Sequence, residues 1–241
     1  MYFPQRYPSN IIHQLSSIET IRYVSSGQPQ QAFFVSESSK PKYLWILLGG
    51  NAAVALQWLP LLAGANIPDT GYLLVDYPGY GMNSGYPSQK NNCQGVLDAF
   101  SALKKQLDLS PNVSILGHSI GAAVAIDVSL SLYPKSLVLV SPFTSMYAMS
   151  KRVIGSIWAW LISPFLWDPY RSEVTLKTLI TTYPDTQILI LHGQSDNVVP
   201  YAMGQKLASI SPSIEFQALV GVGHDLPYAA RDHFLAALRH K

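Results

Sequence analysis

The sequence predicts a single α/β domain, residues 1–241, in which a mostly parallel sheet carries helices on both faces. Short, continuously apolar runs that stop at glycine or polar residues have the pattern of buried parallel strands. Segments with helical spacing alternate with these runs, which implies crossover connections between strands. The length of 241 residues and the apolar fraction of 48% suit one sizeable core.

The expected elements follow from the same patterns. A hairpin opens the fold, with strands around residues 19–24 and 31–35 joined by Ser-Ser-Gly at 25–27. Further strands are expected at 43–48, 71–75, 112–116, 136–140, 187–191 and 214–220, and helices at 52–62, 89–109, 120–132, 201–210 and 227–239. In such sheets reactive groups gather at the carboxyl ends of the strands, so the loops there are the places to look for a site.

Residues 145–184 interrupt this alternation, because they are too many for a single crossover helix. This segment is rich in aromatic residues: Trp158, Trp160, Phe165, Trp167 and Tyr170. We interpret it as a short helical lid, or cap, inserted over the edge of the sheet. The alternative is an ordinary crossover helix followed by a packed loop.

Composition and charge exclude several classes of protein. A net charge of +2 without a basic run argues against binding of nucleic acid. The single cysteine, Cys93, excludes a disulfide framework and a cysteine-ligated metal site. No H-x-x-x-H pair or carboxylate cluster indicates a metal, and neither a metal nor a cofactor is expected.

The first residues lack the basic region and apolar run of a secretory signal. The most apolar stretch, residues 153–167, is shorter than the roughly 18 residues that cross a bilayer, and it contains Pro164. A cytoplasmic location is therefore expected. Peripheral contact with a membrane surface through residues 153–167 is an alternative.

Gly-His-Ser-Ile-Gly at residues 117–121 is a G-x-S-x-G motif between an expected buried strand and an expected helix. In that setting a sharp turn lifts the serine hydroxyl above the sheet. The glycines let the strand and helix backbones pass where a Cβ would clash. The motif therefore makes Ser119 the candidate nucleophile.

A serine hydroxyl needs a base, and the base needs an acid to orient it, in the chain order serine, acid, histidine. The strand ending at Val140 is followed by Ser-Pro-Phe-Thr-Ser, without a carboxylate. The strand ending at Leu191 is followed by His-Gly-Gln-Ser-Asp, so Asp196 is the expected acid. His224, in the glycine-flanked loop after the last strand, is the expected base.

Neighbouring residues offer alternatives to this assignment. Asp196 could be a turn residue that caps the next helix. Asp225 could be the acid, but its adjacency to His224 makes the hydrogen bond awkward, and we expect it to cap the closing helix. His118 and His192 are expected to be packed structural residues. His233 and His240 are expected at the surface.

The oxyanion of a tetrahedral intermediate needs hydrogen-bond donors. One is expected to be the backbone N–H of Ile120, which follows the nucleophile. The other is expected from the loop after an early strand, where Gly-Gly-Asn-Ala occupies residues 49–52. We expect the N–H of Asn51 to be this donor, with Ala52 as a near alternative. A glycine turn that only ends the strand is the simpler reading.

Five segments occur in order along the chain: GGNAA, DYPGYGMNSGYPS, GHSIG, LHGQSDNVVP and GVGHD. With them the chain, from about residue 43 to its end, resembles the α/β-hydrolase superfamily. Its closest resemblance is to the BEM46-like group, which includes the ABHD13- and ABHD17-type hydrolases. Relatives often carry His-Gly where this chain has Gly49-Gly50, and the resemblance places residues 76–88 at the border of the site.

The resemblance implies a Ser119–Asp196–His224 triad and esterase, thioesterase or lipase-like activity, and some relatives remove palmitoyl groups from proteins. Together with the apolar lid, this predicts a serine hydrolase that cleaves an ester or thioester with an apolar acyl group through an acyl-enzyme. The substrate would be a small molecule or an acylated protein. The alternatives are an acyltransferase or peptidase with the same triad, and a non-catalytic binding module with the same fold.

Overall fold

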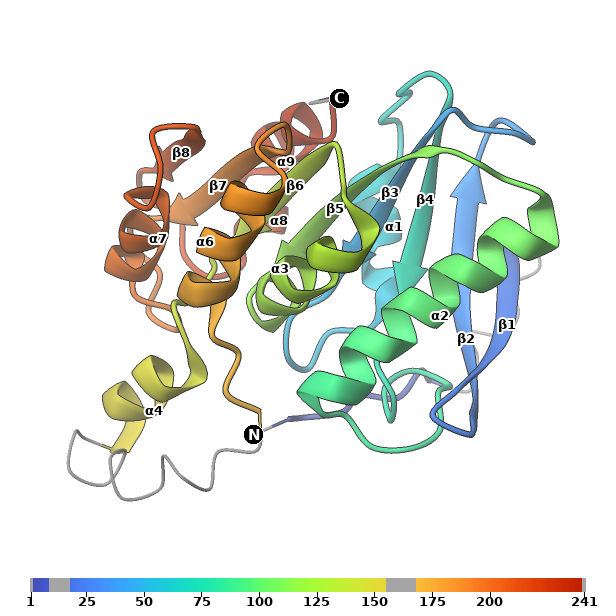
Figure 1. Cartoon of the computed structure of the whole chain (residues 1–241), viewed down its shortest axis with the longest axis horizontal. Helices are drawn as coiled ribbons and strands as arrows, with labels where there is room; N and C mark the ends of the chain where they lie inside the picture. The colour runs from blue at the N-terminus through green and yellow to red at the C-terminus, as the bar shows by residue number, and fades with distance from the viewer. Residues whose placement is uncertain (1, 9–17, 155–167, 240–241) are drawn as a thin grey trace.

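A computed structural model describes residues 2–8, 18–154 and 168–239, which build one eight-stranded sheet between two layers of helices (Figure 1). The strand order is β1-β2-β4-β3-β5-β6-β7-β8. Strands β3 to β8 run parallel, and the hairpin of β1 and β2 joins the β4 edge antiparallel. The mostly parallel sheet predicted from the apolar runs is confirmed.

The strands lie within one or two residues of most expected positions. Their bounds are β1 Glu19–Ser25, β2 Gln28–Ser36, β3 Tyr43–Leu48, β4 Thr70–Val75, β5 Asn112–His118, β6 Ser136–Val140, β7 Gln187–Gly193 and β8 Ile214–Leu219. The hairpin strands are longer than expected, because only Ser26 and Gly27 form the turn, both with positive φ. Two such residues match the right-handed twist of the flanking strands, so pairing begins at once on either side.

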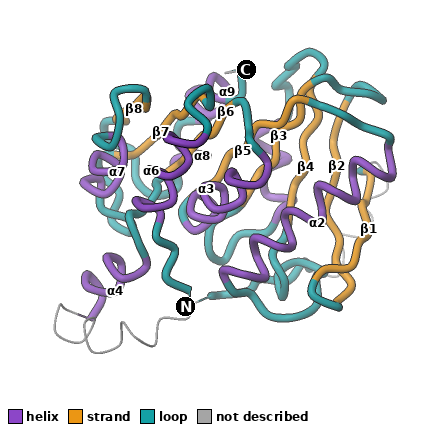
Figure 2. Tube along the Cα trace, in the orientation of Figure 1, coloured by secondary structure: helices purple, strands orange, loops and turns teal. Residues whose placement is uncertain are grey.

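Helices cover the two faces of the sheet as separate layers (Figure 2). One face carries α2 (Gln89–Leu107), α3 (Ile120–Leu132), α6 (Ser172–Thr182) and α7 (Tyr201–Ala208). The other carries the 3-10 helix η2 (Ala55–Trp58) with α1 (Leu59–Leu62), α8 (Leu226–Ala229) and α9 (Arg231–Ala237). Alternate residues of each central strand enter the two cores, as the period of two in a strand requires.

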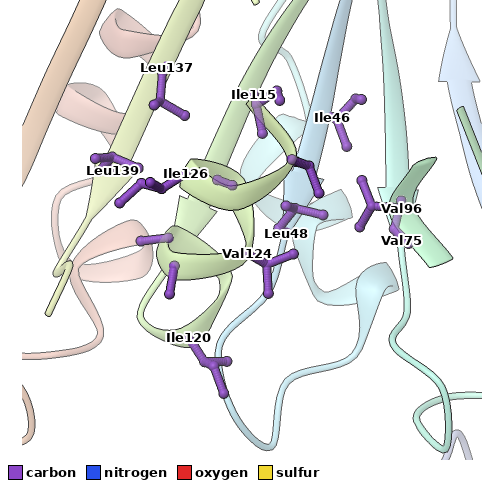
Figure 3. Close-up of a cluster of buried hydrophobic side chains, with 14 of the residues drawn as sticks. Ile46, Leu48, Val75, Val96, Ile115, Ile120, Val124, Ile126, Leu137 and Leu139 are labelled. Carbon is purple, nitrogen blue, oxygen red and sulfur yellow. The ribbon is translucent and has the colours of Figure 1, made fainter. Parts of the chain in front are cut away.

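The core under α3 positions the nucleophile turn. Figure 3 shows Ile46 and Leu48 of β3 and Ile115 of β5 against Val124 and Ile126 of α3. All five side chains are fully buried. Helix α3 is apolar on nearly every side, because the sheet, α2 and α6 surround it. The helix that follows Ser119 is therefore held rigidly over the centre of the sheet.

Two expected helices are broken in the structure. The expected helix at 52–62 begins only at Ala55, because Ala52 has a left-handed φ of 64° and the N–H of Ala53 closes a turn onto Gly50. The expected helix at 227–239 is split at Ala230 into α8 and α9. Tertiary contacts orient α9 separately: Phe234 stacks on Trp58 with ring centroids 5.5 Å apart. Local periodicity carries no signal for such contacts.

Residues 145–184, expected to form a lid, contain two described helices. Helix α4 (Met146–Ile154) projects beyond the sheet layers (Figure 1). Helix α6 lies beside α3, and its Leu176 and Leu179 are fully buried, as in a crossover helix. Residues 155–167, with most of the aromatic residues, lie outside the described part of the chain. The lid therefore stays a prediction. Helix α6 packs against α3 as a crossover helix does, and so it does not belong to a lid.

Candidate active site

The expected site residues gather at the carboxyl ends of β3, β5, β7 and β8, as a parallel sheet predicts. A pocket of about 610 Å³ opens there. Residues 49–54, 57–58, 118–119, 198, 224–225 and 227–228 line it. Ser119, His224 and the proposed oxyanion loop thus share one cavity.

Ser119 occupies a strained turn between β5 and α3. Its φ of 57° and ψ of −118° lie outside the regions that a non-glycine residue prefers. The turn is held because the Ser119 N–H donates to Val140 O at 2.9 Å. A Cβ on Gly117 or Gly121 would overlap backbone oxygens of Gly121 or Leu48, so both glycines are required for this close approach. The side chain is 8% exposed and lines the pocket.

The backbone N–H of Ile120 lies at the start of α3. As the first residue of the helix it has no acceptor four residues earlier within the helix. The positive end of the helix macrodipole also lies here. A donor at this position suits a developing negative charge beside Ser119.

Asp196 is buried in the loop after β7, where four N–H groups lie close to its carboxylate. Its Oδ1 accepts the N–H groups of Val198 at 2.9 Å and Val199 at 2.8 Å. Its Oδ2 lies 2.9 Å from His224 Nδ1 and 3.5 Å from His192 Nε2. Burial alone would raise the pKa of Asp196, but these hydrogen bonds outweigh it and hold the pKa well below its usual range. The carboxylate is therefore ionised at neutral pH.

His224 follows β8 and is oriented by Asp196. Its Nδ1 faces the carboxylate, which leaves Nε2 on the opposite side of the ring. Within the described residues, no hydrogen bond joins Ser119 Oγ to His224, although both line the pocket. Catalytic hydrogen bonds are often long in the absence of substrate. The structure thus brings the expected acid and base into contact and sets the serine across the same cavity.

Asp225 does not take the place of Asp196. The only carboxylate hydrogen-bonded to the His224 ring in the described chain is that of Asp196. Asp225 occupies the N-cap position of α8 as expected, but its side chain makes no capping bond. Its backbone oxygen accepts from Tyr228 and Ala229 instead.

His118, expected to be structural, contacts the base loop directly. Its Nε2 lies 2.9 Å from the backbone oxygen of His224, so Nε2 carries a proton and donates it. Burial, and then the neighbouring His224, lower the pKa of His118 to about 4. The ring is therefore neutral at pH 7 and adds no positive charge beside the base.

His192, also expected to be packed, is fully buried behind Asp196. Its Nε2 lies 3.1 Å from Val199 O and donates to that carbonyl. The same nitrogen lies 3.5 Å from Asp196 Oδ2. Gly204 packs against the ring, and a Cβ there would overlap it. His192 supports the acid loop and lines no part of the pocket.

The expected oxyanion loop, residues 49–54, is anchored by residues that sequence reasoning did not single out. Tyr77 donates from its hydroxyl to Gly49 O at 3.0 Å, and Tyr80 to Asn51 Oδ1 at 2.8 Å. Asn51 and Ala52 both line the pocket, so either N–H stays a candidate for the second oxyanion donor. Residues 76–88 thus border the site from behind the loop, and none of them lines the pocket.

The described residues hold neither a metal-binding cluster nor a helix that spans a membrane. No group of three or more histidine, cysteine or carboxylate side chains could hold a metal there. None of the helices in residues 2–8, 18–154 and 168–239 is long and apolar enough to cross a membrane.

Sequence comparison places the chain among known proteins. An uncharacterized protein of Mycobacterium tuberculosis is 33% identical over 186 residues, which cover 76% of this chain and 63% of that protein. The lysophosphatidylserine lipase ABHD12 of Bos taurus is 32% identical over 219 residues, which cover 83% of this chain and 54% of the lipase. The alpha/beta hydrolase domain-containing protein 17C of Xenopus tropicalis is 25% identical over 216 residues, with 88% and 66% covered. The chain thus spans roughly half to two thirds of the length of these relatives.

Structural comparison and a family model complete the placement. An esterase of Pyrococcus furiosus superposes with a TM-score of 0.71 at 16% identity, over 99% of this chain and 96% of that one. An esterase of a Rhodococcus species superposes with a TM-score of 0.66 at 19% identity, over 93% and 98%. At these identities the likeness is one of fold. The model of the alpha/beta hydrolase family matches residues 45–174, more than half of the chain. The chain therefore has the predicted α/β-hydrolase fold and belongs to the alpha/beta hydrolase family.

Proposed function

We propose that the protein is a serine hydrolase that cleaves an ester or thioester with an apolar acyl group through an acyl-enzyme on Ser119. The observation that carries the proposal is the strained, pocket-facing Ser119, which lies across one cavity from a histidine oriented by a buried carboxylate. Holding a non-glycine residue at positive φ costs about 1–3 kcal/mol, and such strain clusters at active sites.

In the proposed mechanism, His224 Nε2 removes the proton of Ser119 Oγ while Oγ attacks the acyl carbon. The N–H groups of Ile120 and Asn51 bind the oxyanion that forms. His224 then protonates the leaving alcohol or thiol as its bond to the acyl carbon breaks. Water, deprotonated by His224, releases the acid and restores Ser119. Asp196 keeps its charge throughout and orients the imidazolium that forms twice in the cycle.

The walls of the pocket support an apolar acyl group. Besides the triad residues and backbone of the glycines, apolar side chains contribute most of the lining: Ala52, Ala53, Val54, Trp58, Val198, Pro227 and Tyr228. Burying each methylene of an acyl chain there stabilises the complex by about 0.8 kcal/mol. The lipase relative acts on a lipid ester, as its name states, which agrees with this class of substrate. The closer BEM46-like assignment and its thioesterase chemistry remain part of the proposal.

Transfer to an acceptor other than water and cleavage of a peptide would use the same groups. In a transferase, added acceptor alcohols would raise the rate at which the acyl substrate is consumed. In a hydrolase whose slow step is formation of the acyl-enzyme, they would leave this rate unchanged. A non-catalytic binding module is disfavoured because each group that the mechanism needs is present and the acid contacts the base.

The proposed substrate is a small molecule or an acylated protein. Peripheral contact with a membrane is also proposed, from the apolar sequence of residues 153–167. Of these, residues 155–167 lie outside the described residues. Sedimentation with liposomes of neutral phosphatidylcholine tests that contact. A protein lacking residues 155–167 serves as the comparison.

Fluorophosphonate labelling tests the nucleophile. We expect the wild type to be labelled and Ser119→Ala to remain unlabelled and to lose p-nitrophenyl ester hydrolysis. Ser195→Ala is the matched control, because that serine is exposed one residue from Asp196 and lines no part of the pocket. Equal labelling of wild type and Ser119→Ala would refute the mechanism. A series of p-nitrophenyl esters and thioesters of graded chain length then defines the acyl preference.

A further inference from the structure

A short segment far from the triad in sequence crosses the back of the oxyanion loop. Residues 2–8, here called the strap, lie along the carboxyl end of β4 and contact both the oxyanion loop and the loop that follows β4. Arg6 of the strap pairs with Gly81 in a parallel bridge. None of its residues lines the pocket. Its contacts therefore act on the site only through other residues.

The middle of the oxyanion loop is held through the side chain of Asn51. Its Oδ1 accepts the backbone N–H of Phe3 at 2.9 Å and the hydroxyl of Tyr80 at 2.8 Å. Two donors on one oxygen fix the direction of the side chain. Because the side chain and the peptide N–H share one Cα, this also limits rotation of the N–H that is proposed to bind the oxyanion.

The end of the oxyanion loop is held through Tyr7. The Tyr7 hydroxyl accepts the N–H of Leu56 at 3.1 Å and donates to Asp76 Oδ2 at 2.7 Å. The other oxygen of Asp76 accepts the N–H of Ala55 at 2.7 Å. The Tyr7 ring also packs edge-on against Phe33, with centroids 6.0 Å apart. The strap and Asp76 together thus satisfy the first two N–H groups of η2, where the loop ends.

The remaining strap contacts lock it to the loop after β4. The N–H of Gly81 donates to Gln5 O at 2.8 Å, and Arg6 donates to the backbone oxygens of Gly81 and Asn83. A side chain on Gly81 would overlap Asp76 and Tyr7, so this turn is shaped to receive the strap. The strap therefore contacts both loops at once and adds to the direct hydrogen bonds between them, such as that from Tyr80 to Asn51.

We propose that the strap positions the oxyanion loop, with the Phe3 N–H and the Tyr7 hydroxyl as its positioning groups. The inference rests on the proposed function, since it assigns a role only if the Asn51 N–H binds the oxyanion. A positioned donor stabilises the transition state more than the ground state. Loosening it lowers kcat and leaves KM nearly unchanged.

The sharpest test removes a single hydrogen-bond donor from the strap. Phe3→Pro abolishes the N–H that reaches Asn51, while Phe3→Ala keeps it and deletes only an exposed ring. We expect Phe3→Pro to lower kcat for a p-nitrophenyl ester roughly tenfold at unchanged KM, since removing an oxyanion donor outright costs 10²–10³-fold. We expect Phe3→Ala to match the wild type within twofold.

A second pair keeps the test decisive if Phe3→Pro folds poorly. Tyr7→Phe removes the hydroxyl between Leu56 and Asp76, and Tyr2→Phe removes a strap hydroxyl that contacts Tyr170 instead, 3.0 Å away. Tyr7→Phe is expected to lower kcat and to weaken inhibition by phenylboronic acid, which forms a tetrahedral adduct on the serine, by a similar factor. Tyr2→Phe is expected to change neither.

The outcomes separate the two proposals. If the wild type hydrolyses esters and is labelled at Ser119, but Phe3→Pro equals Phe3→Ala and Tyr7→Phe equals Tyr2→Phe in kcat and boronate affinity, the strap has no positioning role. A strap variant that loses thermal stability yet keeps kcat and boronate affinity also overturns the inference. A wild type without esterase activity or labelling overturns the proposed function itself.

Discussion

Two buried carboxylates, Asp196 and Asp76, support the two ends of the same pocket, and their pKa values move in opposite directions. Asp196 lies behind His224 and is 7% exposed, and Asp76 lies behind the oxyanion loop and is 3% exposed. The pKa of Asp196 falls well below the ordinary range, whereas burial raises that of Asp76 to about 6. Both carboxylates are thus shielded from solvent, yet their pKa values shift in opposite directions.

Two differences explain this: Asp76 is packed more deeply than Asp196, and it has fewer partners. Two backbone N–H groups and two imidazole rings face Asp196, which compensates for lost hydration. Among the described residues, the carboxylate of Asp76 has only the Tyr7 hydroxyl and the Ala55 N–H as close donors, with Arg6 as a more distant charge. The contacts of Asp196 therefore stabilise a charge beside His224, whereas those of Asp76 hold the end of the loop at residues 49–54.

Activity gives the largest expected contrast between the ends. Asp196→Asn would leave His224 in the wrong tautomer and lower kcat about 10⁴-fold. Asp76→Asn disturbs only the support of the oxyanion loop, so we expect a loss of roughly tenfold, below that of a deleted oxyanion donor. Stopped assays with p-nitrophenyl butyrate measure both. Equal losses would show that the two carboxylates do not have separate roles.

The pH dependence of stability separates the ends next. Because its folded pKa is raised, Asp76 contributes stability that is complete below about pH 4 and is lost as the pH rises through 6. Asp196, with a lowered pKa, contributes stability above its unfolded pKa that is lost on acidification. The free energy of unfolding of the wild type relative to Asp76→Asn should fall by about 2 kcal/mol between pH 4 and 7.

Urea unfolding of the wild type and Asp76→Asn at several pH values measures this difference. Any constant cost of the asparagine cancels in the comparison. A difference independent of pH would mean that Asp76 titrates normally despite its burial.

Glycine substitutions give a smaller contrast. A Cβ on Gly193 would overlap backbone oxygens of Val222 and Gly223, so Gly193→Ala should destabilise the fold by roughly 2–3 kcal/mol. A Cβ on Gly50 would meet His118 Nδ1 at 3.1 Å and Ser119 Cβ at 3.4 Å. Gly50→Ala should therefore cost less than about 1 kcal/mol, yet lower activity because its methyl group faces the nucleophile.

Thermal unfolding and ester hydrolysis, measured on both alanine variants, give the two readouts. The expected pattern is loss of stability at position 193 and loss of activity at position 50. The reverse pattern would contradict the roles expected for Gly193 in stability and for Gly50 in activity.

The smallest expected effect concerns substrate charge. Asp225 is the only carboxylate among the described residues that line the pocket, and no lysine or arginine is among them. Asp225→Asn should raise kcat/KM for an anionic ester such as p-nitrophenyl hemisuccinate about threefold relative to a neutral ester, and 0.5 M salt should remove the gain. A change that is equal for both esters would indicate an effect on His224 instead.

Much of the site could be predicted from local patterns. Apolar runs located the strands, and the carboxyl ends of those strands placed Ser119 and His224 around one cavity, with Asp196 behind His224. The expected contact between Asp196 and His224 is present in the structure. These residues follow their strands directly, so the parallel sheet alone brings them to one edge.

The strap could not be predicted in this way. Phe3 and Asn51 are 48 residues apart, and Tyr7 and Asp76 are 69 apart. Neither pair belongs to a motif or a periodic pattern. The breaks before Ala55 and at Ala230 escaped prediction for the same reason, because turns and tertiary packing decide them.

The sequence by itself determined the α/β architecture, the sharp turn at Ser119 and the placement of Ser119, Asp196 and His224 after their strands, because each depends on residues within a few positions of a strand end. Only the tertiary structure decided which carboxylate carries a charge, which tyrosines hold the oxyanion loop and that residues 2–8 cross behind it. Those properties depend on burial and on hydrogen bonds between distant segments, and both exist only once the chain has folded.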